Sequence, residues 1–418
     1  MNVLVYNLAD TFFIGQTHNP FQVAAISLAT PVFLIFMSIG NVFGIGGTSV
    51  ISRALGEGKK EYTKKVCSFC FWSCVVVGII ISIAFLIFLD KIVVALGASN
   101  ETLQFTKDYL TIIAFSGPFV LITSCYSNIL RAEGQATKAM MGQIIGNVLN
   151  IILDPLLILS LNFDVKGAAI ATVIGNVVGA LYYIIYFVNG KSILSISIKN
   201  YSYRNKIASG VLSIGIPAAL ASVLMSVSQI IMNSMMAEYG DMALAGVGVA
   251  MKITMITGML SMGIGQGVQP LLGYCTGAMN WNRYHGIMRF SLVLAFIVSA
   301  VLTMLCYLFV NQIVGIFLTE RSAFAYAVRF AKILLTTSTF FGVFFVFANA
   351  LQAMGAATSS LIVNISRQGL IYIPSLFVLR AIIGINGLMW AQPVADVLSL
   401  ILAISLYFGI FKRKKSLM

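Results

Sequence analysis

The chain repeats itself at an offset of 221 residues, and both copies consist mainly of long apolar segments. The same residue types return over a wide stretch: Gly44, Gly46, Gly56, Asn128, Leu130, Ala132, Gly134 and Thr137 recur as Gly265, Gly267, Gly277, Asn349, Leu351, Ala353, Gly355 and Thr358. Because one register is kept across both halves, the chain is predicted to fold into two lobes of like architecture. Duplicated apolar bundles of this kind are typical of transporters, whose substrate passes between the halves.

The composition excludes a soluble protein. Charged residues make up 9% of the chain, against about 25% in a typical soluble protein, and hydrophobic residues make up 59%. The apolar runs are about twenty residues long and do not alternate, which favours transmembrane helices over a barrel. We therefore predict an all-α membrane protein with twelve transmembrane helices in two pseudo-symmetric six-helix lobes.

The expected spans follow the apolar runs. They lie near residues 1–15, 23–50, 67–89, 108–130, 139–161 and 167–188, and then near 208–236, 243–271, 288–310, 330–352, 358–379 and 387–410. Shifting 208–236 back by 221 gives −13 to 15, so the first helix is expected to be truncated in this chain. An apolar stretch is accordingly expected upstream of Met1 in a longer reading frame.

The positive residues predict the topology. With residues 52–65 assigned to the cytoplasm, the connections on that side carry 17 Lys and Arg, against 7 on the other side. This asymmetry places both termini in the cytoplasm, so the net charge of +13 does not indicate nucleic acid. We expect an N-terminal lobe at 1–190, a cytoplasmic linker at 191–207, a C-terminal lobe at 208–410 and a basic tail at 411–418. The chain is expected to be a monomer in a prokaryotic cell membrane.

The cysteines and histidines do not predict a metal site. Cys67, Cys70 and Cys74 share one helix face, but cysteine is an ordinary small apolar residue there and no histidine lies near them in sequence. His18 and His285 fall in separate connections. We expect no metal and no cofactor, apart from a coupling ion, H⁺ or Na⁺.

A polar stripe marks the span 139–161. Gln143, Asn147, Asn150 and Asp154 are spaced by four, three and four residues, so they lie on one helix face and should face protein or water rather than lipid. Pro155 follows directly and removes one backbone hydrogen bond, which frees a carbonyl near Asn150. A carboxylate, an amide and a free carbonyl can bind a proton or a small cation such as Na⁺.

Further polar residues of the first half accompany this stripe. Asp10 has Tyr6 one turn before it, and Thr172 and Asn176 lie one turn apart in the sixth span. The second half has Ile231 and Ser375 in place of Asp10 and Asp154, which predicts one cation site, in the first lobe. Alternatively, Asp10 could cap a helix near the outer surface, and Asp154 could be a packing residue satisfied by Asn150.

The second half offers neutral polar residues and methionines. Gln229, Met232 and Asn233 share the seventh span, and we expect them to line a substrate cavity together with Gln143, Asn147 and Asn176. Methionine suits a wall that accepts many ligand shapes, although it can also be plain filler. Asp396, Lys252 and Arg367 also fall inside spans, where we favour structural pairing or snorkelling.

These residues and their order resemble the multidrug and toxic compound extrusion family across essentially the whole chain. The segments that carry the resemblance are Tyr6–Thr11, Leu130–Gly134, Asn150–Pro155 and Gly267–Tyr274. The resemblance implies cation-coupled export of amphipathic, often cationic compounds by alternating access. It is closest to the branch with first-lobe aspartates, in which Tyr6, Asp10, Asn150, Asp154 and Thr172 would bind the coupling ion.

The sequence disfavours two other classes of protein. A lipid-linked precursor flippase of similar architecture should have a strongly cationic cavity, whereas only Lys252 and Arg367 lie inside the spans. A membrane enzyme would need clustered histidines, Ser–Lys pairs or several acids, and the spans offer none of these. The expected partners are thus small amphipathic molecules and the lipid bilayer.

Overall fold

The computed structural model describes residues 13–416, apart from residues 15, 18, 162, 191, 205 and 319, and within this part the chain is helical with no strand. The first half contains α2 (Pro20–Gly56), α3 (Lys60–Ile87), α4 (Leu89–Ala95), α5 (Asn100–Phe115), α6 (Gly117–Ala132), α7 (Ala136–Asp154), the π-helix η1 (Pro155–Ser160) and α8 (Asp164–Val188). A short 3₁₀ turn, η2 (Ile198–Asn200), follows in the connection between the halves.

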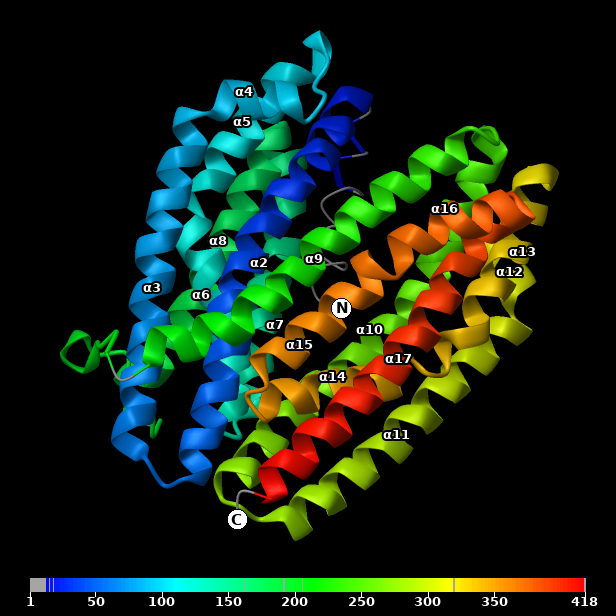
Figure 1. Ribbon diagram of the computed structural model, residues 1–418. Coiled ribbons are helices and arrows are strands. Elements are labelled where there is room, and N and C mark those ends of the chain that lie inside the picture. Colours follow the sequence, from blue (N-terminus) through cyan, green and yellow to red (C-terminus); the bar gives the residue numbers. More distant parts are fainter. Residues whose placement is uncertain are drawn as a thin grey trace. The chain divides into compact units, whose positions relative to one another are not determined.

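The second half repeats this order with two differences. It begins with α9 (Ile207–Ala237), whose repeat positions in the first half lie largely outside the described residues, and it has one further helix directly after its π-helix. Its helices are α10 (Asp241–Gly277), α11 (Trp281–Leu308), α12 (Val310–Phe317), α13 (Arg321–Ser338), α14 (Phe341–Ala353), α15 (Ala357–Ile365), the π-helix η3 (Ser366–Leu370), α16 (Tyr372–Ile383) and α17 (Ile385–Ser416). Figure 1 shows them from green through yellow to red.

The helix boundaries keep the 221-residue offset of the sequence. α10 begins and ends 221 residues after α2, and α15 and α17 begin 221 residues after α7 and α8. The halves diverge after the start of α7 and α15. α7 runs for 19 residues before its π-helix, whereas α15 runs for only 9. The backbones of the two halves therefore differ in the part of the repeat that carries the polar stripe in the first half.

The described helices account for eleven membrane spans by length and composition. Nine are continuous helical stretches, in which α7 runs on into η1 and α15 runs through η3 into α16, and two are bent pairs, α5 with α6 at 58° and α13 with α14 at 47°. Each bent pair covers one predicted span, 108–130 or 330–352. The predicted fold class, an all-helical membrane protein, is confirmed, while the predicted first span at 1–15 falls almost entirely outside the described residues.

The outer faces of the helices are apolar, as a surface in contact with lipid requires. On α3 the exposed side chains include Val76, Ile79, Ile80, Ile83 and Ile87. The equivalent face of α11 exposes Ile297, Val301, Met304 and Leu308. Such continuous apolar surface is rare on soluble proteins, and here the bilayer covers it.

The described chain separates into two compact units. The first ends at Gly215 and excludes Leu55–Gly58, and the second contains Leu55–Gly58 together with the chain from Ile216 onwards. Large buried aromatic residues fix the first unit. The Tyr126 hydroxyl donates to the Cys67 carbonyl oxygen at 3.0 Å, and the Tyr183 hydroxyl donates to that of Ala139 at 2.5 Å. The boundary between the two units falls inside α9, after Gly215. The predicted lobe limits at residues 190 and 208 stay predictions.

Candidate functional site

The polar stripe of α7 faces the interior of the first unit. Asn150 and Asp154 are buried, at 3% and 0% exposure, and Gln143 and Asn147 are half-buried. By contrast, Val148 and Ile152 on the opposite face of the helix are exposed. Since a bilayer offers no hydrogen-bond partners, the polar face turns towards neighbouring helices and the apolar face towards lipid.

Glycines bring α7 and α8 into direct backbone contact next to the stripe. A Cβ atom on Gly146 would lie 2.6 Å from the carbonyl oxygen of Gly175, and one on Gly175 would lie 2.6 Å from that of Gly146. One turn away, a Cβ on Gly179 would come within 3.0 Å of the Gly142 carbonyl oxygen. Small residues spaced by four on both helices are the usual means of close helix packing in membranes. The sequence carries this signal at 142–146 and 175–179.

This close packing places Asn150 between Asp154 and Thr172. The Asn150 Nδ2 atom donates to Asp154 Oδ1 and to Thr172 Oγ1, both at 3.4 Å. Both distances are long for a hydrogen bond. The Asn150 Oδ1 atom is buried and has no hydrogen-bond partner among the described residues. A buried carbonyl oxygen without a donor can accept from a proton carrier or coordinate a cation.

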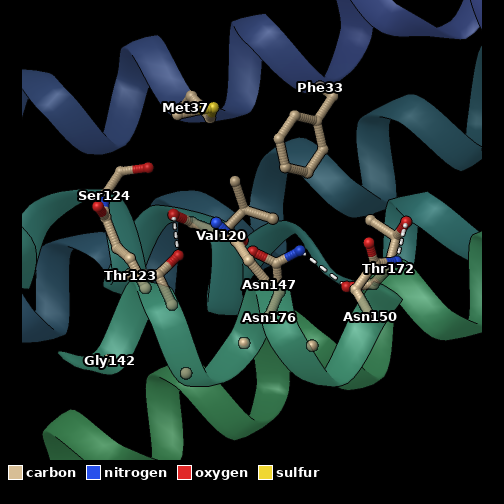
Figure 2. A pocket seen from close by; sticks show the side chains of 14 residues that line it. Phe33, Met37, Val120, Thr123, Ser124, Gly142, Asn147, Asn150, Thr172 and Asn176 are labelled. Carbon is tan, nitrogen blue, oxygen red and sulfur yellow. Dashed lines mark hydrogen bonds between the residues drawn. The ribbon is translucent and has the colours of Figure 1, made fainter. Parts of the chain in front are cut away.

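A small cavity lies beside this cluster. Its volume is about 50 Å³, which is enough for a few water molecules or one small ion. The lining comes from α2, α6, α7 and α8, and it includes the predicted residues Gln143, Asn147, Asn150, Thr172 and Asn176. Figure 2 shows the asparagines and Thr172 on one side and Phe33 and Met37 of α2 across from them. Asp154 does not line the cavity but reaches it through Asn150.

Some lining residues were not predicted. Thr123 and Ser124 of α6 contribute hydroxyl groups, and Phe33, Met37 and Val120 contribute apolar walls. The same span also contains Thr111, Ser116 and Ser127, so the sequence does not single out these two hydroxyl residues. Nothing in the pattern of α2 distinguishes Phe33 and Met37 from residues that face lipid.

The backbone changes its geometry directly after the cluster. Pro155 cannot donate a backbone hydrogen bond, so the Ile151 carbonyl has no amide donor four residues later. The helix continues as the π-helix η1, in which the Leu161 amide donates to the Leu156 carbonyl at 3.0 Å. π-helical turns inside membrane helices frequently accompany functional sites, because they free backbone groups.

The other predicted site residues are placed differently. Tyr6 and Asp10 lie outside the described residues. Gln229, Met232 and Asn233 belong to the second unit, where Gln229 and Asn233 are exposed on α9. Met232 is fully buried and packs in an apolar cluster with Met235, Met236 and residues of α10. Within the described part of the chain, the predicted residues that gather around one cavity are thus Gln143, Asn147, Asn150, Thr172 and Asn176.

The second unit has its own buried charges. Arg367 Nε donates to Asp396 Oδ1 at 2.8 Å, and the Gln392 amide donates to the same oxygen at 2.9 Å. Thr337 Oγ1 donates to the other oxygen, Asp396 Oδ2, at 3.4 Å. The guanidinium of Arg367 stacks over Phe341, Phe344 and Phe345, with distances of 4.8–5.3 Å to the ring centroids. Both partners are satisfied, which agrees with a structural role for this pair.

No metal centre is found in the described part of the chain, where no three His, Cys, Asp or Glu side chains gather closely enough to hold an ion. Cys67, Cys70 and Cys74 are buried as free thiols, and Cys67 lies 3.6 Å from the Tyr126 hydroxyl. The oxygen-rich group in the first unit, formed by Asn150, Asp154 and Thr172, instead suits a proton or a weakly bound monovalent cation.

Comparison with known proteins identifies the family. The MatE family profile matches residues 1–156 and 217–378. The chain is 35% identical over 412 residues to "Multidrug export protein MepA" of Staphylococcus haemolyticus (strain JCSC1435), covering 98% of this chain and 90% of that protein. It is 33% identical over 405 residues to the protein of the same name from Staphylococcus aureus (strain MRSA252), with coverages of 97% and 89%.

Solved structures share the fold. A structure described as "MATE in the bent conformation" superimposes with a TM-score of 0.94 at 23% identity, over 100% of this chain and 93% of the other. An outward-facing multidrug resistance MATE family transporter gives a TM-score of 0.93 at 23% identity, over 99% and 93%. The family profile and the two relatives confirm the resemblance read from the sequence, and the chain belongs to the MatE family of multidrug and toxic compound extrusion proteins.

Proposed function

We propose that this protein is a secondary multidrug efflux transporter, which exchanges H⁺ or Na⁺ for amphipathic, often cationic compounds by alternating access. The observation that carries the proposal is the buried Asn150–Asp154–Thr172 cluster beside a polar cavity in the first unit. Relatives named as multidrug export proteins, matched over nearly their full length, support the substrate class.

Coupling follows from charge. An ionised Asp154 inside an apolar bundle favours a conformation that gives it a counter-charge, and binding of H⁺ or Na⁺ removes that need. If the ion and the substrate prefer different conformations, binding of one reduces the affinity for the other, which is sufficient for antiport. Asp10, on the first predicted helix, would provide the second carboxylate, with Tyr6 beside it.

The lining of the described cavity favours this function over the transfer of a lipid-linked precursor. A pyrophosphate headgroup requires cationic side chains, and this lining contains amides, hydroxyls and apolar groups but no Lys or Arg. In the same proposal the protein is a monomer in a bacterial cell membrane, with both termini in the cytoplasm.

The test is dye efflux from proteoliposomes, run once with a pH jump and once with a sodium jump. We expect one of the two gradients to drive efflux, and the Asp154→Asn and Asp10→Asn variants to lose the gradient-driven part. Asp108→Asn is the matched control, because Asp108 pairs with Lys166 at 3.3 Å and lies away from the cavity. Normal efflux by both single variants, under both gradients, would refute the coupling assignment.

A further inference from the structure

A second cavity lies on the second unit, away from the cluster described above. Its volume is about 390 Å³, within the range of pockets that hold small organic ligands. The buried side chains of Met288, Phe347 and Tyr407 form its floor. Its walls are Leu292 and Val293 of α11 and Phe408 and Phe411 of α17. Nearly the whole surface is apolar, so the cavity suits a hydrocarbon chain.

The mouth of this cavity is basic. His285 and Arg289 lie one turn apart on α11 and on the same face as Met288, Leu292 and Val293, and both are exposed. Neither has a hydrogen-bond or ion-pair partner among the described residues. A guanidinium at the edge of an apolar groove is well suited to a phosphate group, which it can bind through two parallel N–H donors.

The surroundings add positive charge. The ring of Phe411 lies 4.9 Å from that of His285 and 5.1 Å from that of Trp281, so the end of α17 adjoins the start of α11, as Figure 1 shows. Lys412 and Arg413, which continue α17 directly after Phe411, therefore belong to the same end of the unit. In the sequence, no Asp or Glu occurs between residues 242 and 319 or after Asp396. Charge complementarity thus favours an anionic ligand.

The geometry points to a binding site for an anionic phospholipid, such as phosphatidylglycerol. One acyl chain lies in the groove between α11 and α17, and the phosphate is bound by Arg289 with His285. With the predicted orientation, this lipid belongs to the cytoplasmic leaflet, where basic pockets between membrane helices commonly bind anionic headgroups. Lipid binding at this site does not require transport activity.

Native mass spectrometry of the purified protein tests this site. Phosphatidylglycerol and phosphatidylcholine with identical acyl chains are compared, and glycerol phosphate is added as a soluble headgroup. We expect retention of phosphatidylglycerol in preference to phosphatidylcholine, with no displacement by glycerol phosphate. Arg289→Gln should weaken phosphatidylglycerol binding about fivefold, the factor that corresponds to one basic residue at an anionic surface.

Two further variants make the result specific. Arg283→Gln, on the same helix but outside the cavity lining, should leave the preference unchanged. Val293→Trp fills the groove from an exposed position, where folding is not at risk, and should reduce the retention of both lipids. Equal losses in Arg283→Gln and Arg289→Gln, displacement by glycerol phosphate, or full retention by Val293→Trp would each overturn the proposed site.

Discussion

Arg367 and Asp396, which form the buried ion pair of the second unit, stand at the two positions that the 221-residue repeat assigns to Gly146 and Gly175. In the first half these positions are the point at which the backbones of α7 and α8 touch. In the second half a salt bridge of 2.8 Å joins η3 to α17. One crossing point of a duplicated fold is therefore held by close packing in one copy and by charge in the other.

Neutralising one member of the ion pair should destabilise the second unit. Asp396→Asn leaves the guanidinium of Arg367, only 12% exposed, without a counter-charge. We expect a loss of about 3–5 kcal/mol in the free energy of unfolding, as is found when a buried pair is broken from one side. Thermal unfolding in detergent measures it. The double change Arg367→Met with Asp396→Leu should recover most of the loss, and a single variant as stable as the parent would contradict this account.

Adding a methyl group at the glycine crossing should separate α7 from α8. A Cβ on Gly146 would lie 2.6 Å from a backbone oxygen that cannot move aside, so Gly146→Ala is expected to cost about 1–3 kcal/mol. The cavity residues on both helices would shift with it, and efflux should fall. Gly263→Ala is the control, since no atom lies within 4 Å of its added Cβ. Circular dichroism melting and dye efflux are measured on both variants, and equal stability and efflux in Gly146→Ala and Gly263→Ala would contradict the prediction.

The hydroxyl of Thr172 should contribute to ion affinity. Thr172→Val keeps the shape of the side chain but removes the acceptor of the Asn150 amide at 3.4 Å. Losing one hydrogen bond of about 1 kcal/mol should raise the ion concentration for half-maximal efflux about fivefold. Thr172→Ser restores the acceptor and should behave like the parent. An unchanged ion dependence in Thr172→Val would remove this residue from the site.

Glu133, in the connection after α6, should make stability depend on pH. Its Oε1 atom accepts hydrogen bonds from the Ser192 hydroxyl at 2.7 Å and the Ile193 amide at 2.6 Å. Burial nevertheless raises the pKa of the Glu133 carboxyl above its ordinary value of 4.5. The folded protein then holds this proton more tightly than the unfolded chain does, so the stabilisation is present below pH 4.5 and is lost as the pH rises through the folded pKa.

Glu133→Gln tests that dependence, because the amide oxygen still accepts both hydrogen bonds but does not ionise. Unfolding midpoints at pH 5, 6, 7 and 8 should decline less with pH in Glu133→Gln than in the parent. Glu101→Gln, at an exposed position on α5, should follow the parent. Parallel curves for the parent and Glu133→Gln would show that burial of Glu133 has no effect on stability.

Much of the fold could be predicted, because apolar runs of membrane length and a fixed repeat offset are strong signals. The bends at Ser116 and near Thr339 were not predicted, although the sequence carries a signal at each: Gly117 and Pro118 directly follow the first bend, and the polar run 336–339 lies at the second. The polar stripe from Gln143 to Asp154 correctly predicted which face of α7 is buried, because polar groups find no hydrogen-bond partners in lipid. Thr172 and Asn176 line the cavity beside this face, and their role in ion or substrate binding stays a prediction.

The second half was harder to predict from the sequence. Met232 is an apolar side chain, and periodicity cannot distinguish a cavity wall from a packed core, which is where Met232 lies. Phe33 and Met37 were missed because, in the sequence, an apolar side chain that lines a cavity looks the same as one that faces lipid. Residues that carry charge or amides into lipid are identifiable from the sequence, whereas apolar residues take their roles from neighbours that the sequence does not reveal.

The two crossing points also constrain how such a protein diverges. At Gly146 and Gly175 almost any exchange introduces atoms where a backbone already lies, so both positions should stay small whatever happens elsewhere. A single substitution at Arg367 or Asp396 leaves the other residue without its counter-charge, whereas substitution of both by apolar residues does not. Substitutions at Arg367 and Asp396 should therefore occur together during evolution. The two copies of the duplicated crossing point are thus under different constraints on which substitutions they tolerate.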